Sequence, residues 1–259
     1  MKNQKSFEKK DIKLSVVVLC YREGKRIIPF IDRLEVLLNS LNISWEMILV
    51  GNYIEGSDDK TQYIVKEIEK NKTNVKAIAE PKKGMMGWDM RKGMELAIGE
   101  YICVIDGDGQ FPIESIALCY DKMKENRYDL IKTYRQRRED GFYRILISKI
   151  YNFIFKILFP GVKFRDVNSK PKLIRREAYN KIKNILKSDD WFIDAEIMIL
   201  ARRYDFNIGE IPVNFYSLKN KRASFVKFTA ILEFIKNLII YRIKEFLYEK
   251  KYFYYWCFI

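Results

Sequence analysis

The sequence of 259 residues contains no histidine, and this absence narrows the chemistry that the protein can perform. Without imidazole there is no His-based zinc site and no nucleophile of the Ser–His or Cys–His type. The side chain most often used as a general base near neutral pH is missing as well. An enzyme with this sequence therefore has to work with carboxylates, a hard metal ion or the positioning of its substrates.

Cysteines and long apolar runs are also scarce. The four cysteines are widely separated and form no C-x-x-C pair, which argues against a zinc ribbon and a dense disulfide framework and fits reduced thiols. The polar start, MKNQKSFEKKDIK, lacks the apolar core of a signal peptide. No uncharged apolar run approaches the roughly 18–20 residues that cross a bilayer. We therefore expect a cytoplasmic protein that does not span a membrane.

Positive charge, by contrast, is abundant and concentrated in one stretch. The 48 Lys and Arg against 34 Asp and Glu give a net charge of +14. Residues 131–183 hold fifteen Lys and Arg and four acidic residues, so this basic stretch alone contributes 15 − 4 = +11. A field of this size attracts nucleotides, nucleic acid or an anionic membrane surface, although a solvated basic face gives the same pattern.

Short β-branched runs alternate with segments of helical spacing along most of the chain. This alternation predicts an α/β fold with a mostly parallel central sheet flanked by helices. The predicted strands are residues 14–21, 45–50, 75–79, 101–105, 129–133 and 208–215. The predicted helices are 26–41, 60–71, a segment ending near 97, 113–126, 142–158 and about 191–204, with a charged loop at 135–141 and a mixed stretch at 162–174.

Three parts of the chain differ in character. Residues 1–13 are polar, and 14–224 form the predicted catalytic domain. Residues 225–259 combine helix-spaced apolar residues with Lys and Arg and end in YFYYWCFI. A basic amphipathic helix with an aromatic end is typical of a segment that lies in a membrane interface. A helix that packs on the core or on a second subunit is the alternative.

The predicted strand at residues 101–105 leads into the sequence DGDGQFP. Ligands of open α/β sheets bind beyond the carboxyl ends of the strands, so Asp106 and Asp108 lie where a substrate is expected. Two carboxylates one residue apart can converge on a divalent cation, Mg²⁺ or Mn²⁺, with Gln110 and diphosphate oxygens as further ligands. An ordinary turn is the alternative, because Asp and Gly are turn residues.

Several segments together resemble glycosyltransferase family 2, and within it the polyprenyl-phosphate glycosyltransferases typified by dolichyl-phosphate mannosyltransferase. The resemblance covers nearly all of residues 14–225. It implies a GT-A fold, a nucleotide-sugar donor, a divalent cation and inversion at the anomeric carbon. The segments that carry it are residues 14–26, 50–61, 81–99, 101–112, 144–172 and 210–224.

The resemblance also implies roles for individual residues. Asp106 and Asp108 match the acidic motif that binds the metal and the donor diphosphate, and Gln110 matches the polar residue after it. Asp194 lies at the later acidic motif, in WFIDAEIMI, and completes the predicted catalytic set. The donor set is Tyr21, Glu23, Asn52, Gly84, Arg91 and Asp106. The acceptor-phosphate set is Arg138, Arg144, Ser148, Arg165, Ser169 and Lys170, of which the last three lie in RDVNSKPK, which resembles the family's RD..SG.. stretch.

The sequence departs from the family after the second predicted strand. In VGNYIEGSDDKT, Gly51 and Asn52 replace two aspartates of the family, and residues are inserted before Gly56. One of the lost aspartates ordinarily contacts the nucleotide base. The base of the donor is therefore not carried over from the resemblance.

The acceptor decides which catalytic groups the reaction needs. A polyprenyl phosphate is already an anionic nucleophile, needs no strong base and suits a chain without histidine. A sugar hydroxyl requires a base, for which Asp194 is the candidate. We expect a metal-dependent, inverting transferase on the inner face of the cell membrane that uses a polyprenyl-phosphate or lipid-linked acceptor. The alternatives are transfer to a saccharide hydroxyl in surface-polysaccharide synthesis, an inactive membrane scaffold and a basic nucleic-acid-binding protein; we expect no nucleic-acid partner.

Overall fold

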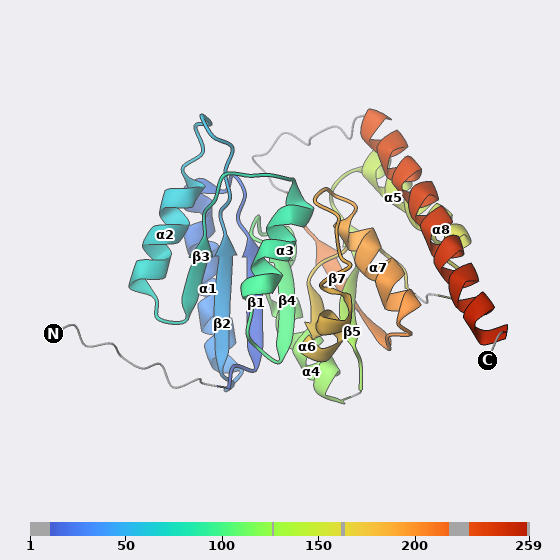
Figure 1. Ribbon diagram of the computed structural model, residues 1–259. Helices are drawn as coiled ribbons and strands as arrows, with labels where there is room; N and C mark the ends of the chain where they lie inside the picture. The colour runs from blue at the N-terminus through green and yellow to red at the C-terminus, as the bar shows by residue number, and fades with distance from the viewer. Residues whose placement is uncertain (1–10, 126, 162–163, 218–227, 258–259) are drawn as a thin grey trace.

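A seven-stranded sheet forms the centre of the computed structural model, which describes residues 11–125, 127–161, 164–217 and 228–257 (Figure 1). The strand order is β3–β2–β1–β4–β6–β5–β7, and among these strands β6 alone runs antiparallel to its neighbours. This order confirms the predicted mostly parallel α/β sheet. The strands are β1 (Leu14–Leu19), β2 (Trp45–Val50), β3 (Val75–Ile78), β4 (Tyr101–Asp106), β5 (Leu130–Arg138), β6 (Lys172–Arg175) and β7 (Ile208–Phe215).

Helices cover both faces of the sheet, which explains why β1 and β2 are mostly apolar and are buried along their whole length. Alternate residues of β1 face opposite sides of the sheet: Val16 and Val18 pack against the helices of one layer, and Val17 packs against those of the other. The first layer contains α1 (Ile27–Ser40), which follows a short 3-10 helix, α2 (Thr61–Asn71) and α4 (Glu114–Glu125). The second contains α3 (Met86–Leu96), α5 (Phe142–Leu158), α6 (Arg176–Ile182) and α7 (Ile193–Arg203).

The predicted elements differ from the observed ones mainly between residues 130 and 182. β5 continues through Arg138 into the predicted charged loop, because it pairs with β7 along its length. The helix α6 follows the predicted mixed stretch and was not predicted as a separate element. The predicted boundary between residues 224 and 225 lies outside the described residues, as do residues 1–10.

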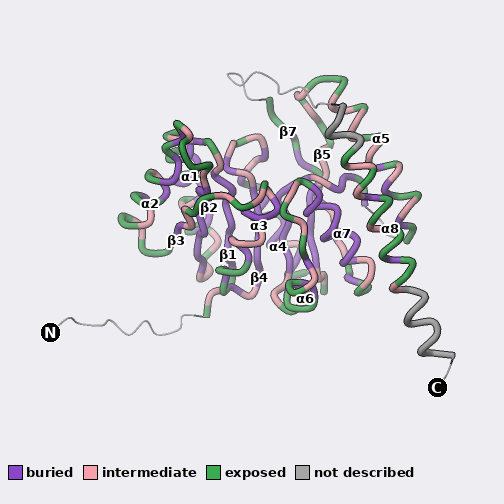
Figure 2. The backbone as a smooth tube through the Cα atoms, turned by 45° about the horizontal axis from the view of Figure 1, so that its top comes forward, coloured by how far each residue is buried: buried purple, intermediate pink, exposed green. Residues whose placement is uncertain are grey.

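The last helix, α8 (Phe228–Cys257), confirms the predicted C-terminal helix and lies beside α5 (Figures 1 and 2). Tyr151 of α5 contacts Phe234 of α8, with ring centroids 5.6 Å apart. Leu238 is buried, and Glu245 is buried in an ion pair with Arg203 of α7. One face of α8 therefore packs on the domain. None of the helices in the described ranges is long and apolar enough to cross a bilayer.

Candidate active site

The predicted metal site is a tight turn at the carboxyl end of β4. Asp106 ends the strand, and the Oδ1 atom of Asp108 accepts the backbone N–H of Gln110 at 3.0 Å. Gly109 has a φ of +76°, a conformation that favours glycine. The side-chain nitrogen of Gln110 donates to the carbonyl of Tyr216 at 3.1 Å, so Oε1 is the atom that this amide can offer a cation.

Lys170 joins the metal turn to Asp194. The Nζ atom of Lys170 lies 3.1 Å from Oδ1 of Asp106 and 3.5 Å from Oδ2 of Asp194. Lys172 is 2.5 Å from the other carboxylate oxygen of Asp194. The side chains of Lys170, Lys172 and Asp194 are only 2–3% exposed, whereas that of Asp106 is 27% exposed. The structure thus brings together three residues that were predicted for different roles.

The two lysines are held in place by the backbone around them. The hydroxyl of Thr133 on β5 donates to the carbonyl of Lys170 at 2.6 Å. It also lies 2.7 Å from the hydroxyl of Ser169, and Lys172 Nζ donates to the carbonyl of Ser169 at 2.9 Å. The backbone of Lys170 and the ammonium of Lys172 therefore belong to one framework of hydrogen bonds.

The pKa of Asp194 follows from this environment. Burial alone would raise the pKa of its carboxyl group, but the ammonium groups of Lys170 and Lys172 outweigh burial and hold it below its ordinary value. Burial lowers the pKa of Lys172 to about 8 even though Asp194 opposes this shift. Asp194 is therefore an ion-paired carboxylate inside the protein.

A second buried ion-pair cluster lies beside the first. Arg135 binds Asp166 through two hydrogen bonds of 2.6 and 2.9 Å. Lys132, fully buried on β5, donates to the backbone carbonyl of Asp166 and lies 3.5 Å from Glu210. The sequence did not predict the roles of Lys132, Arg135 and Lys172. The lysines between apolar residues in the strands LIKT and PKLI were the available signal.

The residues predicted for the acceptor phosphate fall into two groups: three lie near the buried charges, and the other three are arginines whose side chains lie outside the two ion-pair clusters. Ser148 on α5 accepts a long hydrogen bond of 3.4 Å from Arg135, and Ser169 and Lys170 are buried nearby. Arg138 instead pairs with Asp140, at 2.6 Å. The remaining two are Arg165, whose guanidinium stacks 4.4 Å from the ring centroid of Tyr134, and Arg144, which is half-buried on α5.

The predicted donor residues lie around the ends of β1 and β2. The side chain of Asn52 accepts the backbone N–H of Glu80 and donates to Asp89, both at 2.9 Å. Asp89 forms an ion pair with Lys82, whose Nζ atom lies 4.1 Å from the ring centroid of Tyr21. Burial raises the pKa of Asp89 despite its two partners. Asn52, which stands where the family has an aspartate, thus anchors a carboxylate from α3.

Glu23 and the remaining donor residues have structural partners. The side chain of Glu23 is buried and lies 3.4 Å from the guanidinium of Arg26. Gly84 packs so closely on the loop at 187–190 that an added Cβ atom would lie 2.9 Å from Cβ of Asp189. Arg91 forms an ion pair with the same Asp189.

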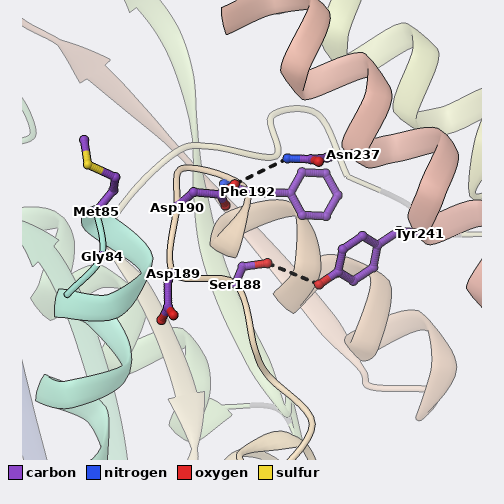
Figure 3. A pocket seen from close by; sticks show the side chains of 8 residues that line it. All are labelled: Gly84, Met85, Ser188, Asp189, Asp190, Phe192, Asn237 and Tyr241. Atoms are coloured by element: carbon purple, nitrogen blue, oxygen red, sulfur yellow. Dashed lines mark hydrogen bonds between the residues drawn. The ribbon is translucent and has the colours of Figure 1, made fainter.

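A pocket of about 320 Å³ opens between the start of α3, the loop at 187–190 and α8 (Figure 3). Asn237 of α8 donates to Asp190 at 3.3 Å. Tyr241 donates its hydroxyl hydrogen to Glu196 at 2.8 Å. The helix α8 is therefore hydrogen-bonded to the loop that packs on the first turn of α3. The pocket is lined by Gly84, Met85, Ser188, Asp189, Asp190, Phe192, Asn237 and Tyr241.

The turn after β4 carries the type of ligand that Mg²⁺ and Mn²⁺ prefer, namely carboxylate and amide oxygens. Within the described ranges, no group of three or more His, Cys, Asp or Glu converges on one point. The turn therefore fits a cation that also takes oxygens from a diphosphate and from water, as Mg²⁺ commonly does.

Comparison with known proteins bears on this arrangement. The family model described as "Glycosyl transferase family 2" matches residues 15–183. A dolichyl-phosphate beta-glucosyltransferase of Trichomonas vaginalis is 25% identical over 254 residues, which cover 92% of this chain and 76% of that protein. Another from Saccharomyces cerevisiae is also 25% identical, covering 90% of this chain and 75% of that protein.

Solved structures share the fold at low sequence identity. Glucosyl-3-phosphoglycerate synthase from Mycobacterium tuberculosis, in complex with UDP, is 14% identical with a TM-score of 0.65, covering 89% of this chain and 80% of that one. The same synthase has been solved with Mn²⁺, UDP-glucose and phosphoglyceric acid. Mannosyl-3-phosphoglycerate synthase from Rubrobacter xylanophilus is 13% identical with a TM-score of 0.63, covering 90% of this chain and 74% of that one. These matches confirm the predicted GT-A fold.

Proposed function

The chain belongs to glycosyl transferase family 2, and from this membership we propose that it transfers a sugar, with inversion, from a nucleotide-sugar donor to a polyprenyl phosphate. Its catalytic class, glycosyltransferase, is common to the family and to the relatives compared above. Those relatives are named for a dolichyl-phosphate acceptor and match at least 90% of the chain. Polyprenyl phosphates are the chemical class to which that acceptor belongs.

The state of Asp194 is the observation that carries the choice of acceptor. Both of its oxygens face ammonium groups, at 2.5 and 3.5 Å, and its pKa is lowered. A general base needs a pKa near the working pH and a free oxygen close to the proton that it takes. Asp194 therefore suits a reaction that needs no base. A phosphate oxygen is such a nucleophile, whereas a saccharide hydroxyl is not.

The donor side of the reaction is assigned to the turn after β4. Displacement of a nucleoside diphosphate leaves negative charge on the departing oxygen. A divalent cation held by Asp106, Asp108 and Oε1 of Gln110 would neutralise part of that charge. The ammonium of Lys170 lies beside the same turn, 3.1 Å from Asp106, and adds a fixed positive charge.

The exposed faces of α5 and α8 support a membrane surface as the place of the reaction. On α5 the exposed apolar residues recur every three or four positions, and Phe142 is 80% exposed. A similar row lies on α8, which runs beside α5 (Figure 2). The two rows are Phe142, Leu146, Ile150, Phe153 and Ile157 on α5, and Ile239, Ile243, Phe246 and Leu247 on α8. Exposed lysines flank them at 149, 156, 236 and 244.

Apolar rows flanked by lysines are typical of helices that lie in an anionic membrane interface. On its inner face, α5 carries Ser148 and Asn152, and the side-chain oxygen of Asn152 accepts the N–H of Val167 at 2.8 Å. The same helix therefore reaches the buried charge clusters from one side and solvent from the other. We propose that the lipid tail of the acceptor stays in the bilayer while α5 places its phosphate at the site.

A transfer assay with defined acceptors tests this function. The donors are sugar conjugates of UDP, GDP and dTDP, each with Mn²⁺, and the acceptors are a polyprenyl phosphate, the unphosphorylated polyprenol and a free saccharide. We expect product with the polyprenyl phosphate alone. Asp108→Asn should lower kcat on the order of 100-fold. Asp121→Asn, the same change at a half-exposed carboxylate on α4, should not. Transfer to the saccharide and not to the lipid phosphate would refute the proposal.

Liposome flotation tests the membrane surface separately. Phe153→Asp places a charge in the row on α5 and should reduce binding to liposomes of phosphatidylcholine and phosphatidylglycerol. Val36→Asp, a comparable change at an exposed position on α1, should leave binding at the wild-type level. Equal binding by all three proteins would show that α5 does not contact the membrane.

A further inference from the structure

The ammonium of Lys170 occupies one side of a carboxylate that the divalent cation would use. Its Nζ atom lies 3.1 and 3.4 Å from the two oxygens of Asp106. We propose that Lys170 is a built-in counterion of Asp106, which makes cation binding at the turn conditional on a nucleoside diphosphate. The inference rests on the proposed function only in taking such a diphosphate as the ligand of this turn.

The distances assign the charge of Lys170 to Asp106 more than to Asp194. Lys172 approaches Asp194 to 2.5 Å, whereas Lys170 stays 3.5 Å from it. Lys172 and Asp194 form an ion pair with no net charge. The shorter contact of Lys170 is the one to Asp106. Lys170 therefore acts mainly on the metal turn.

Lys170 cannot move away from the turn easily. Its side chain is 3% exposed, and its Nζ atom is also 3.2 Å from the sulfur of Met86. Its backbone carbonyl accepts a hydrogen bond from Thr133. To leave Asp106, the ammonium would have to cross protein that surrounds it. A divalent cation that enters the turn therefore meets a positive charge that stays.

A charge count gives the consequence for metal binding. Asp106 contributes one negative charge, and Lys170 cancels it. The pair therefore attracts an ion of charge +2 only weakly, and the ammonium repels that ion in surroundings of low dielectric constant. A diphosphate brings further negative charge and the missing oxygen ligands. The cation and the diphosphate should therefore bind with strong positive coupling, which is reciprocal.

Binding of Mn²⁺, followed by the electron paramagnetic resonance signal of the free ion, tests the inference without an activity assay. The full chain is titrated alone and with UDP or GDP. We expect weak binding alone and binding tightened by about tenfold or more with the nucleotide that fits. In Lys170→Met, Mn²⁺ alone should bind about fivefold or more tightly than in the wild type, and the effect of the nucleotide should shrink by the same factor.

Lys172→Met is the matched control, because it removes an ammonium from the same cluster that pairs with Asp194. Its coupling between Mn²⁺ and nucleotide should stay near the wild-type value. Equal effects of Lys170→Met and Lys172→Met, or no tighter Mn²⁺ binding in Lys170→Met, would overturn the inference. If thermal melting shows that Lys170→Met is unfolded, Lys170→Gln takes its place.

Measurements on the wild-type protein, without any variant, can also refute the inference. Mn²⁺ that binds as tightly without a nucleotide as with one would overturn it, and so would no binding of Mn²⁺ under either condition. Failure of the proposed function looks different. In that case the coupling between Mn²⁺ and nucleotide is present, but no sugar reaches the polyprenyl phosphate.

Discussion

Replacement of Asp194 by asparagine is the most informative single change in this protein. It keeps the size of the side chain and removes the negative charge between Lys170 and Lys172. Both lysines have side chains that are only 3% exposed, so neither can exchange its lost partner for water. Lys172 depends on Asp194 most, because their charged atoms are 2.5 Å apart.

The expected loss of stability is large for one substitution. Removing one partner of a buried ion pair commonly costs about 3–5 kcal/mol, because the other charge stays buried without compensation. For a chain of this length, that loss corresponds to a fall in Tm of roughly 6–20 °C. Adding Lys172→Met to Asp194→Asn removes the orphaned charge. The double variant should therefore recover a substantial part of the loss.

Urea unfolding followed by circular dichroism measures this loss. Asp121→Asn is the control, because it makes the same change in a half-exposed pair with Lys124, where ion pairs contribute little. A free energy of unfolding within about 1 kcal/mol of the wild type for Asp194→Asn would refute the buried-pair reasoning. In folded enzyme, the pH profile of kcat should keep its shape. The disappearance of one ionisation from that profile would identify Asp194 as a general base.

Three further predictions concern packing, the attachment of α8 and pH. Gly87→Ala should cost about 1–3 kcal/mol in urea unfolding, because its Cβ atom would lie 2.5 and 2.6 Å from the backbone carbonyl oxygens of residues 188 and 190; wild-type stability would contradict this. Tyr241→Phe should cost about 1 kcal/mol, through loss of the hydrogen bond to Glu196, and an unchanged value would show that the bond contributes nothing. Asp166 and Asp194 have pKa values below the 3.8 of the unfolded chain, so their stabilising contribution is present above that pH and is lost as the pH falls below it. Urea unfolding at a series of pH values should show this decline, with a smaller slope in Asp166→Asn, and stability that rises towards acid pH would contradict it.

The parts of the fold that were predictable are those fixed by local apolar patterns. The strand β2 and the helix α5 have the predicted limits. A continuous apolar run predicts a buried strand, and apolar residues at helical spacing predict a helix, from a few neighbouring residues alone. The position of Asp106 and Asp108 was predictable for a related reason. A strand that ends in DGDGQ places its carboxylates at the carboxyl edge of the sheet, and this position does not depend on contacts with distant residues.

The partners of the buried charges depend on contacts that no local pattern contains. Lys132 meets the carbonyl of a residue 34 positions away and the side chain of Glu210, 78 positions away. The contact with Glu210 follows from the pairing of β5 with β7, in which Lys132 and Glu210 are opposite each other. The contact with residue 166 follows from the antiparallel β6, which places the chain before it beside β5. The order of these strands is a property of the whole sheet. A lysine between apolar residues shows only that a charge will be buried, not what will neutralise it.

This distinction changes the meaning of the basic stretch at residues 131–183. From the sequence alone, its charge of +11 is either a field that attracts nucleotides, nucleic acid or an anionic membrane surface, or a solvated basic face. Six of its cations are instead engaged with carboxylates of the domain in the described ion pairs: Lys132, Arg135, Arg138, Lys170, Lys172 and Arg175. Of these, Lys170 alone contacts a carboxylate of the metal turn among the described ion pairs. Under the proposed function, a donor diphosphate at this turn would therefore meet the buried ammonium of Lys170 and the divalent cation more directly than the summed charge of the stretch.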